Sequence, residues 1–158
     1  MKWLTEPLRK IADYRYLIEN IQTKNTPVLA TGVIDVQKTQ LIYSICEELD
    51  AKALIIAYDE TAAKNICNDI SMLNAKALYY PAKDFIFYSA DVHSSDITKQ
   101  RFKAIDDLLR GEADFVCTTA EALFERLMTK KVMQSYVLEL KEGDIISLDE
   151  LVKNLVFM

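Results

Sequence analysis

The segment from Gly32 to Thr39 contains the residues with the clearest potential for chemistry. A phosphate loop has the pattern G-x-x-x-x-G-K-[ST]. Its backbone N–H groups surround phosphates, its lysine reaches the outer phosphates, and its hydroxyl binds magnesium. Gly32, Lys38 and Thr39 stand at three of these positions, but Gln37 replaces the second glycine. A side chain at that position obstructs the close approach of backbone to phosphate. The spacing therefore predicts a vestigial phosphate loop.

Acidic residues around this loop also argue against catalysis. Asp35 would place a carboxylate beside the space that a triphosphate fills, where like charges repel. Asp114 precedes a predicted strand, and no Asp or Glu ends that strand as a second magnesium ligand would. We expect no ATP hydrolysis and no working catalytic, cofactor or metal site in this chain. The alternative, that Lys38 and Thr39 are only the exposed first turn of a helix, stays open.

Two other groups of residues have a weaker potential for function. His93 is the single histidine and has Ser94 and Ser95 beside it, but no nucleophile-elbow sequence is present, and the serines suit a helix cap. An aromatic group could stack on nucleic-acid bases: Tyr79, Tyr80, Phe85, Phe87 and Tyr88. Basic residues are not interleaved with it, which favours a role in the core and in anchoring a loop.

Apolar periodicity predicts the elements that would position these residues. A helix from about Thr5 to Gln22 precedes four short apolar runs, at 28–31, 53–58, 77–80 and 115–117, with amphipathic helical stretches after each. This alternation predicts an α/β fold of three layers, with four parallel strands side by side and helices on both faces. The continuous apolar run at 53–58 predicts a strand buried on both faces. Gly111 suits a helix end, and Thr118 with Glu121 suits a helix start.

The pattern changes towards the C-terminus. An extended segment is predicted from Ser135 to Leu140, followed by a turn and by a helix after Ser147, where Ser147 and Glu150 form a capping pattern. We predict three parts: a helical segment at 1–26, an α/β domain at 27–129 and the truncated start of a second domain at 130–158. The apolar end at 156–158 is more typical of a cut within a domain than of a natural terminus.

Composition limits the class of protein. Of 158 residues, 51% are hydrophobic and 27% charged, which is typical of a globular protein, and the net charge of -5 disfavours unaided DNA binding. The three cysteines, Cys46, Cys67 and Cys117, form no Cys-x-x-Cys pair, so we expect buried thiols in a reducing compartment. The N-terminus has no signal-peptide pattern, and no apolar run approaches the roughly 20 residues of a membrane span. These features predict a cytoplasmic protein.

Several stretches resemble a known family. They are 80–84 with Tyr88, the segment 93–97 with Arg101, and 114–123 followed by Arg126 and Leu127. In this order they resemble the N-terminal UvrB-like module of the bacterial transcription-repair coupling factor (Mfd). The resemblance covers nearly the whole chain from about Val28. It implies a degenerate phosphate loop in an α/β domain of the P-loop NTPase and helicase type, similar to domain 1a of UvrB.

The resemblance also implies a context. The complete coupling factor is an ATP-dependent DNA translocase that displaces stalled RNA polymerase and recruits UvrA in transcription-coupled nucleotide excision repair. ATP and magnesium serve its motor, which lies C-terminal to this region, and UvrA binds an inserted domain that would begin here near Lys130. We expect this chain alone to bind neither DNA nor UvrA tightly. The alternative is a free-standing P-loop enzyme, a kinase or a helicase fragment such as UvrB, against which Gln37 and Asp35 argue.

Overall fold

The computed structural model describes residues 2–83, 91–124, 126–127, 129–135, 138, 140–143 and 145–157. The chain divides into two compact units, Met1–Phe124 and Glu125–Met158. The borders predicted from the sequence at residues 26 and 129 stay predictions. The first unit contains, in order, α1 (Lys2–Arg9), α2 (Ala12–Gln22), α3 (Asp35–Leu49), β1 (Ala53–Ala57), α4 (Glu60–Met72), β2 (Ala77–Tyr79), α5 (Asp91–Leu109), β3 (Phe115–Thr119) and α6 (Ala120–Leu123).

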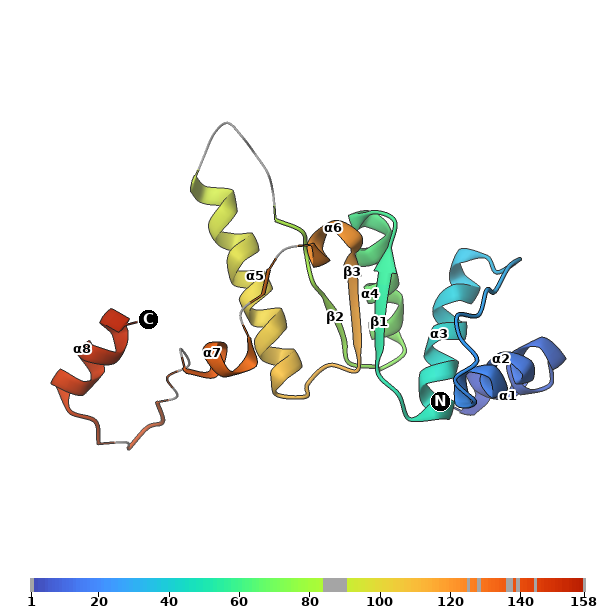
Figure 1. Ribbon diagram of the computed structural model, residues 1–158, viewed down its shortest axis with the longest axis horizontal. Coiled ribbons are helices and arrows are strands. Elements are labelled where there is room, and N and C mark those ends of the chain that lie inside the picture. The colour runs from blue at the N-terminus through green and yellow to red at the C-terminus, as the bar shows by residue number, and fades with distance from the viewer. Residues whose placement is uncertain are drawn as a thin grey trace. The chain divides into compact units, whose positions relative to one another are not determined.

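The described residues of the first unit form an α/β structure around an open parallel sheet of three strands in the order β1-β3-β2 (Figure 1). β3 lies in the middle, with Leu54 of β1 and Leu78 of β2 both beside its Val116. Because β1 and β2 both pair with β3 in parallel, the carboxyl ends of these strands meet at one edge of the sheet.

Helices cover both faces of this sheet. On one face, α3 and α4 bury a cluster of Tyr43, Cys46, Cys67, Ile70, Phe115 and Cys117. On the other, Ala104 and Ile105 of α5 pack with Leu78 and Val116. The α/β class with parallel strands is therefore confirmed. Gly111 ends the turn after α5 with a φ of 74°, and its N–H donates to the Leu108 carbonyl at 3.1 Å, as its position in the sequence predicted.

The predicted strand at 28–31 is wrong. Residues 25–31 have no regular secondary structure, and the side chain of Leu29 is 86% exposed. A short apolar run has strand composition, but a strand forms only where its backbone pairs with a neighbour. In the described part of the chain, no strand pairs with this segment.

The prediction that the strand at 53–58 is buried on both faces is also wrong. Leu54 is 58% exposed and Ile56 is 55% exposed, whereas Ala53 and Ile55 pack against the core of the α3–α4 face. β1 is an outer strand, and α5 packs on β2 and β3, so its cover does not extend to Leu54 and Ile56.

The single helix predicted at 5–22 is two helices, α1 and α2, and Pro7 lies inside the first of them. The break has tertiary contacts on both sides. Arg9 and Tyr14, on either side of it, both donate to the Glu48 carboxylate of α3, at 3.2 and 3.0 Å. In one continuous helix, residues five apart point about 140° away from each other.

Two other helix starts differ from prediction. α5 begins at Asp91, so Ser94 and Ser95 lie inside its first turns and do not precede it as caps. The cap of α6 is Thr119, whose Oγ1 accepts from the Ala122 N–H at 3.4 Å. The predicted cap, Thr118, lies one residue too early, and its hydroxyl donates to the Tyr80 carbonyl instead.

Among its described residues, the second unit contains two helices, α7 (Lys130–Ser135) and α8 (Leu148–Phe157). α8 begins directly after Ser147, as predicted, whereas α7 was not predicted. Of the extended segment predicted at 135–140, Ser135 is helical, Leu138 and Leu140 have no regular structure, and residues 136, 137 and 139 lie outside the described part.

Candidate functional site

The segment that the sequence predicts to be a vestigial phosphate loop, Gly32 to Thr39, leads into the start of α3. Gly32 has a φ of 75° and lies exposed before the helix, where an active loop also has a glycine. Helix α3 already begins at Asp35, so Val36 and Gln37 are helical. The Lys38 N–H donates to the Ile34 carbonyl at 2.9 Å within the helix. This backbone group is therefore engaged and does not point freely at a phosphate.

The Lys38 side chain has an internal partner. Its Nζ lies 2.8 Å from Oδ1 of Asp35, one helical turn earlier. The hydrogen bond and the charge of Lys38 lower the pKa of the Asp35 carboxyl, and Asp35 in turn raises the pKa of Lys38. Both side chains are at least half exposed, so the pair is accessible to water, but the lysine already has an anion beside it.

The third motif residue, Thr39, points away from solvent. It is only 4% exposed, and its Oγ1 has no hydrogen-bond partner among the described residues. A magnesium ion bound to a phosphate loop must reach the hydroxyl from the phosphate side. The structure thus places the Lys38 side chain beside Asp35 at the surface, whereas the Thr39 side chain is buried and is not part of this pair.

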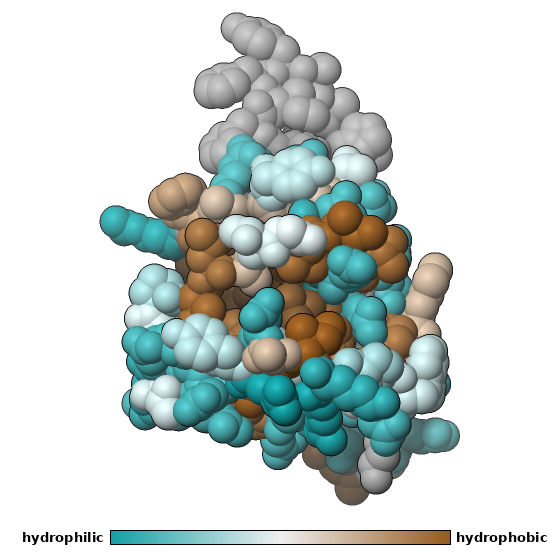
Figure 2. Space-filling view, turned by 90° about the vertical axis from the view of Figure 1, so that its right-hand side faces the viewer, coloured by the Kyte–Doolittle hydropathy of each residue, from teal (hydrophilic) through white to brown (hydrophobic). Residues whose placement is uncertain are grey.

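A cavity of about 490 Å³ lies next to this loop, between the N-terminal helices, residues 28–33 and the start of α3. Figure 2 shows a hollow with brown, apolar side chains on this face of the molecule. Gln37 and Leu41 line it from α3, with Leu8 and Leu17 opposite. Among the described residues that line it, Asp13 is the only charged one. An apolar cavity with one carboxylate does not stabilise a triphosphate, which needs positive charge and N–H donors.

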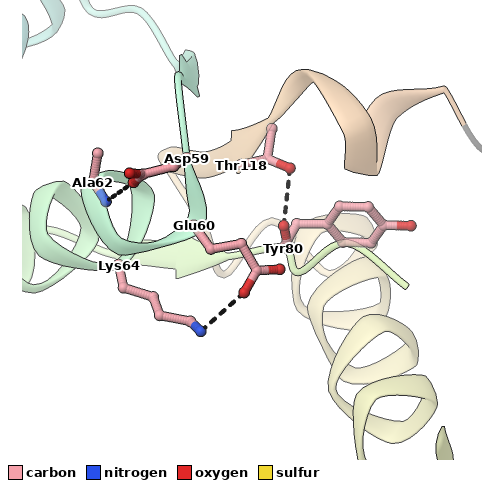
Figure 3. Close-up of polar contacts among 6 residues, drawn as sticks. All are labelled: Asp59, Glu60, Ala62, Lys64, Tyr80 and Thr118. Carbon is pink, nitrogen blue, oxygen red and sulfur yellow. Dashed lines mark hydrogen bonds and ion pairs between the residues drawn. The ribbon is translucent and has the colours of Figure 1, made fainter. Parts of the chain in front are cut away.

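The carboxyl edge of the sheet is the usual ligand site in open parallel sheets. Here its polar groups hold the fold together (Figure 3). Asp59 caps α4 by accepting from the Ala62 N–H at 2.6 Å, and Glu60 lies 3.2 Å from Lys64. The Thr118 hydroxyl donates to the Tyr80 carbonyl at 2.9 Å. Burial and the nearby Glu60 carboxylate raise the pKa of Tyr79.

Arg101 of α5 is a buried charged residue whose structural role was not predicted from the sequence. It is 8% exposed, and its Nη1 donates to the Pro81 carbonyl at 2.7 Å. Its guanidinium also lies over the ring of Tyr80, 4.4 Å from the ring centroid. The signal was present: Arg101 stands in the apolar stripe of α5 between Ile97 and Ala104, at helical spacing.

The other residues considered from the sequence divide into three groups. Tyr80 is buried and Tyr79 partly buried in the core, as predicted, while Phe85, Phe87 and Tyr88 lie outside the described residues. His93 lies in the first turn of α5. The three cysteines are free and buried, as predicted, although the fold gathers them in one cluster. There a hydrogen bond between thiols raises the pKa of Cys117 and lowers that of Cys67.

Within the described residues, His, Cys, Asp and Glu form no group of three or more that could hold a metal ion. No helix in the described part of the chain is long and apolar enough to cross a membrane. Comparisons with protein-family models, with curated proteins and with solved structures find no match to this chain. The class of this chain therefore comes from its fold alone: the described residues form an α/β domain with an open parallel sheet.

Proposed function

We propose that this chain is a non-catalytic module of a DNA-repair translocase, the N-terminal UvrB-like part of a transcription-repair coupling factor. The main support for a non-catalytic role is the ion pair between Lys38 and Asp35, because it occupies the lysine that a nucleotide would need. The burial of Thr39 and the helical backbone at Lys38 support the same conclusion.

The fold type is part of this proposal. A parallel sheet with β3 between β1 and β2, helices on both faces and a Gly-containing loop before α3 are compatible with a P-loop NTPase or helicase domain whose phosphate loop has decayed. The main departure is that residues 28–31 pair with no strand in the described part of the chain, since the loop of an active domain follows a strand.

Partners and cofactors belong, in this proposal, to the complete translocase in the cytoplasm. Its motor uses ATP and magnesium, and its other regions bind DNA, RNA polymerase and UvrA. This chain contributes the α/β scaffold and the beginning of the UvrA-binding domain. The negative net charge of the chain supports the absence of DNA binding, because phosphate contacts come mainly from Lys and Arg.

Titration with a fluorescent ATP analogue and magnesium tests the proposal. The wild-type chain should give no saturable binding. A variant with Asp35→Ala and Gln37→Gly frees Lys38 and removes the obstructing side chain, so it should gain measurable affinity if the loop is a relic. Asp69→Ala, an exposed residue on α4, is the matched control and should gain none.

Two results would count against the proposal. Saturable micromolar binding by the wild type that Lys38→Ala abolishes would favour the free-standing P-loop enzyme. No gain by the double variant would favour a chance match of Gly32, Lys38 and Thr39 to the motif. Recruitment is tested separately, by a pull-down with purified UvrA. It should fail for this chain and succeed for a version extended through the complete inserted domain of the coupling factor.

A further inference from the structure

The outer edge of β1 is open. All five of its residues pair with β3 on the inner side, from Ala53 with Phe115 to Ala57 with Thr119. On the outer side, no strand in the described part of the chain pairs with it. Such an edge presents unpaired N–H and C=O groups, which are a template for another strand.

The side chains at this edge are apolar and uncovered on one face. Leu54 and Ile56 are more than half exposed, and Tyr58, which follows with the same alternation, is 90% exposed. On β3 and β2 the equivalent positions, Val116 and Leu78, pack against α5. An uncovered apolar face therefore adjoins the open backbone.

The usual protection of an edge strand is missing. Natural sheets blunt their edges with lysine, proline or a bulge inside the strand. The strand reads Ala-Leu-Ile-Ile-Ala and has no charge or proline, and its pairing with β3 is regular throughout. The first basic residue, Lys52, lies outside the strand and contacts the Ala113 carbonyl at 3.0 Å and Asp114 at 3.5 Å.

We propose that β1 is a self-association surface, at which two copies of this chain pair their β1 strands antiparallel about a twofold axis at Ile55. The strand sequence supports a second copy as the occupant because its residue sizes are nearly the same in both directions. Small alanines stand at both ends and large branched residues stand between them. Self-complementary patches of this kind form closed, symmetric dimers.

The register follows from the alternation of side chains. Pairing centred on Ile55 overlaps all five residues and places Ala53 opposite Ala57 of the other copy. It also places Leu54 opposite Ile56, so that two copies of each form one apolar cluster on the uncovered face. A shift by one residue would mix exposed and core-facing side chains. The paired segment is short, so the dimer belongs to the weak, concentration-dependent class.

Sedimentation equilibrium of the complete chain over a wide range of concentrations tests the association. The wild type should change from monomer to dimer as its concentration rises. Leu54→Lys places a charge on the edge and should abolish the dimer, without changing the circular dichroism spectrum. Met72→Lys is the matched control: Met72 is 79% exposed but lies on α4, so this variant should still form dimers.

Cross-linking tests the register. Under mild oxidation, a Leu54→Cys chain mixed with an Ile56→Cys chain should form disulfide-linked dimers, whereas each chain alone should form few, because Leu54 lies opposite Ile56 and not opposite itself. The three native cysteines are buried and should not compete. A chain that stays monomeric at every concentration overturns the proposal and leaves the edge to a strand of another protein. A dimer that persists in Leu54→Lys also overturns it, because the contact then lies elsewhere.

Discussion

Replacing Arg101 with methionine should substantially destabilise the first unit. The substitution keeps an unbranched apolar side chain in the same space but removes the guanidinium. It deletes the 2.7 Å hydrogen bond to the Pro81 carbonyl and the contact of the charge with the Tyr80 ring at 4.4 Å. Both contacts join α5 to the segment that follows β2.

The magnitude follows from these two contacts. A hydrogen bond from a charged donor contributes about 1.5–3 kcal/mol, and a cation–π contact of a desolvated cation about 1–2 kcal/mol. Because the two share one side chain, we expect a total loss of about 2–4 kcal/mol in the free energy of unfolding. In urea, this corresponds to a midpoint lowered by about 1–2 M for a small domain.

The assay is urea unfolding followed by circular dichroism, with Lys103→Met as the control, since Lys103 is an exposed residue on the same helix. Arg101→Lys should be intermediate, because an ammonium keeps the charge but loses the planar fork. A loss for Arg101→Met within about 0.5 kcal/mol of the control would refute the reasoning, since surface substitutions alone change stability by that much.

Two further predictions concern the core and the pH dependence of stability. Ile70→Ala should cost about 2–5 kcal/mol in unfolding free energy, because Ile70 is fully buried, whereas Met72→Ala on the exposed side of the same helix should cost about 0.5 kcal/mol or less; equal losses would contradict the packing of α4 on the sheet. Burial and the hydrogen bond to Glu48 raise the pKa of Tyr14, so the unfolded chain ionises this tyrosine near pH 10 while the folded chain does not. Stability should therefore fall as the pH rises above about 10, and Tyr14→Phe should make this fall smaller in urea titrations across that range; an unchanged slope would exclude Tyr14 as a cause.

Local signals in the sequence were sufficient for most elements of the first unit. The apolar stripe at Ala63, Ile66 and Ile70 predicted α4, and Gly111 predicted the end of α5, because the physical causes lie within a few residues of each position. The break between α1 and α2 was not predictable in this way. No proline or glycine stands at residues 10–11, and the residues on either side of the break contact Glu48, which is distant in the sequence.

The pairing of strands in the sheet was likewise not predictable from local signals in the sequence. The strands at Leu54 and Val28 were both predicted from apolar runs, but whether a run pairs, and whether it is central or at an edge, depends on residues elsewhere in the chain. Only the structure shows that Val28 lies in an unpaired segment and Leu54 on an outer strand. In the candidate site, the sequence supplied the motif positions and the carboxylate of Asp35, but not the burial of Thr39.

The position of Asp35 connects the loop with the stability of α3. Asp35 is the first residue of the helix, where a negative charge interacts favourably with the partial positive charge of the N-terminus. In an active phosphate loop, the bound phosphate supplies that negative charge and the lysine contacts it. Here the Asp35 carboxylate supplies the negative charge at the helix start and also contacts the lysine, at 2.8 Å from Lys38. The chain thus contains its own anion beside Lys38 at the start of α3, so the N-terminus of this helix has a negative charge near it without a bound nucleotide. Removing Asp35 alone should therefore leave both the helix start and Lys38 without an anion. This is why the Asp35→Ala substitution is included with Gln37→Gly in the nucleotide-binding variant.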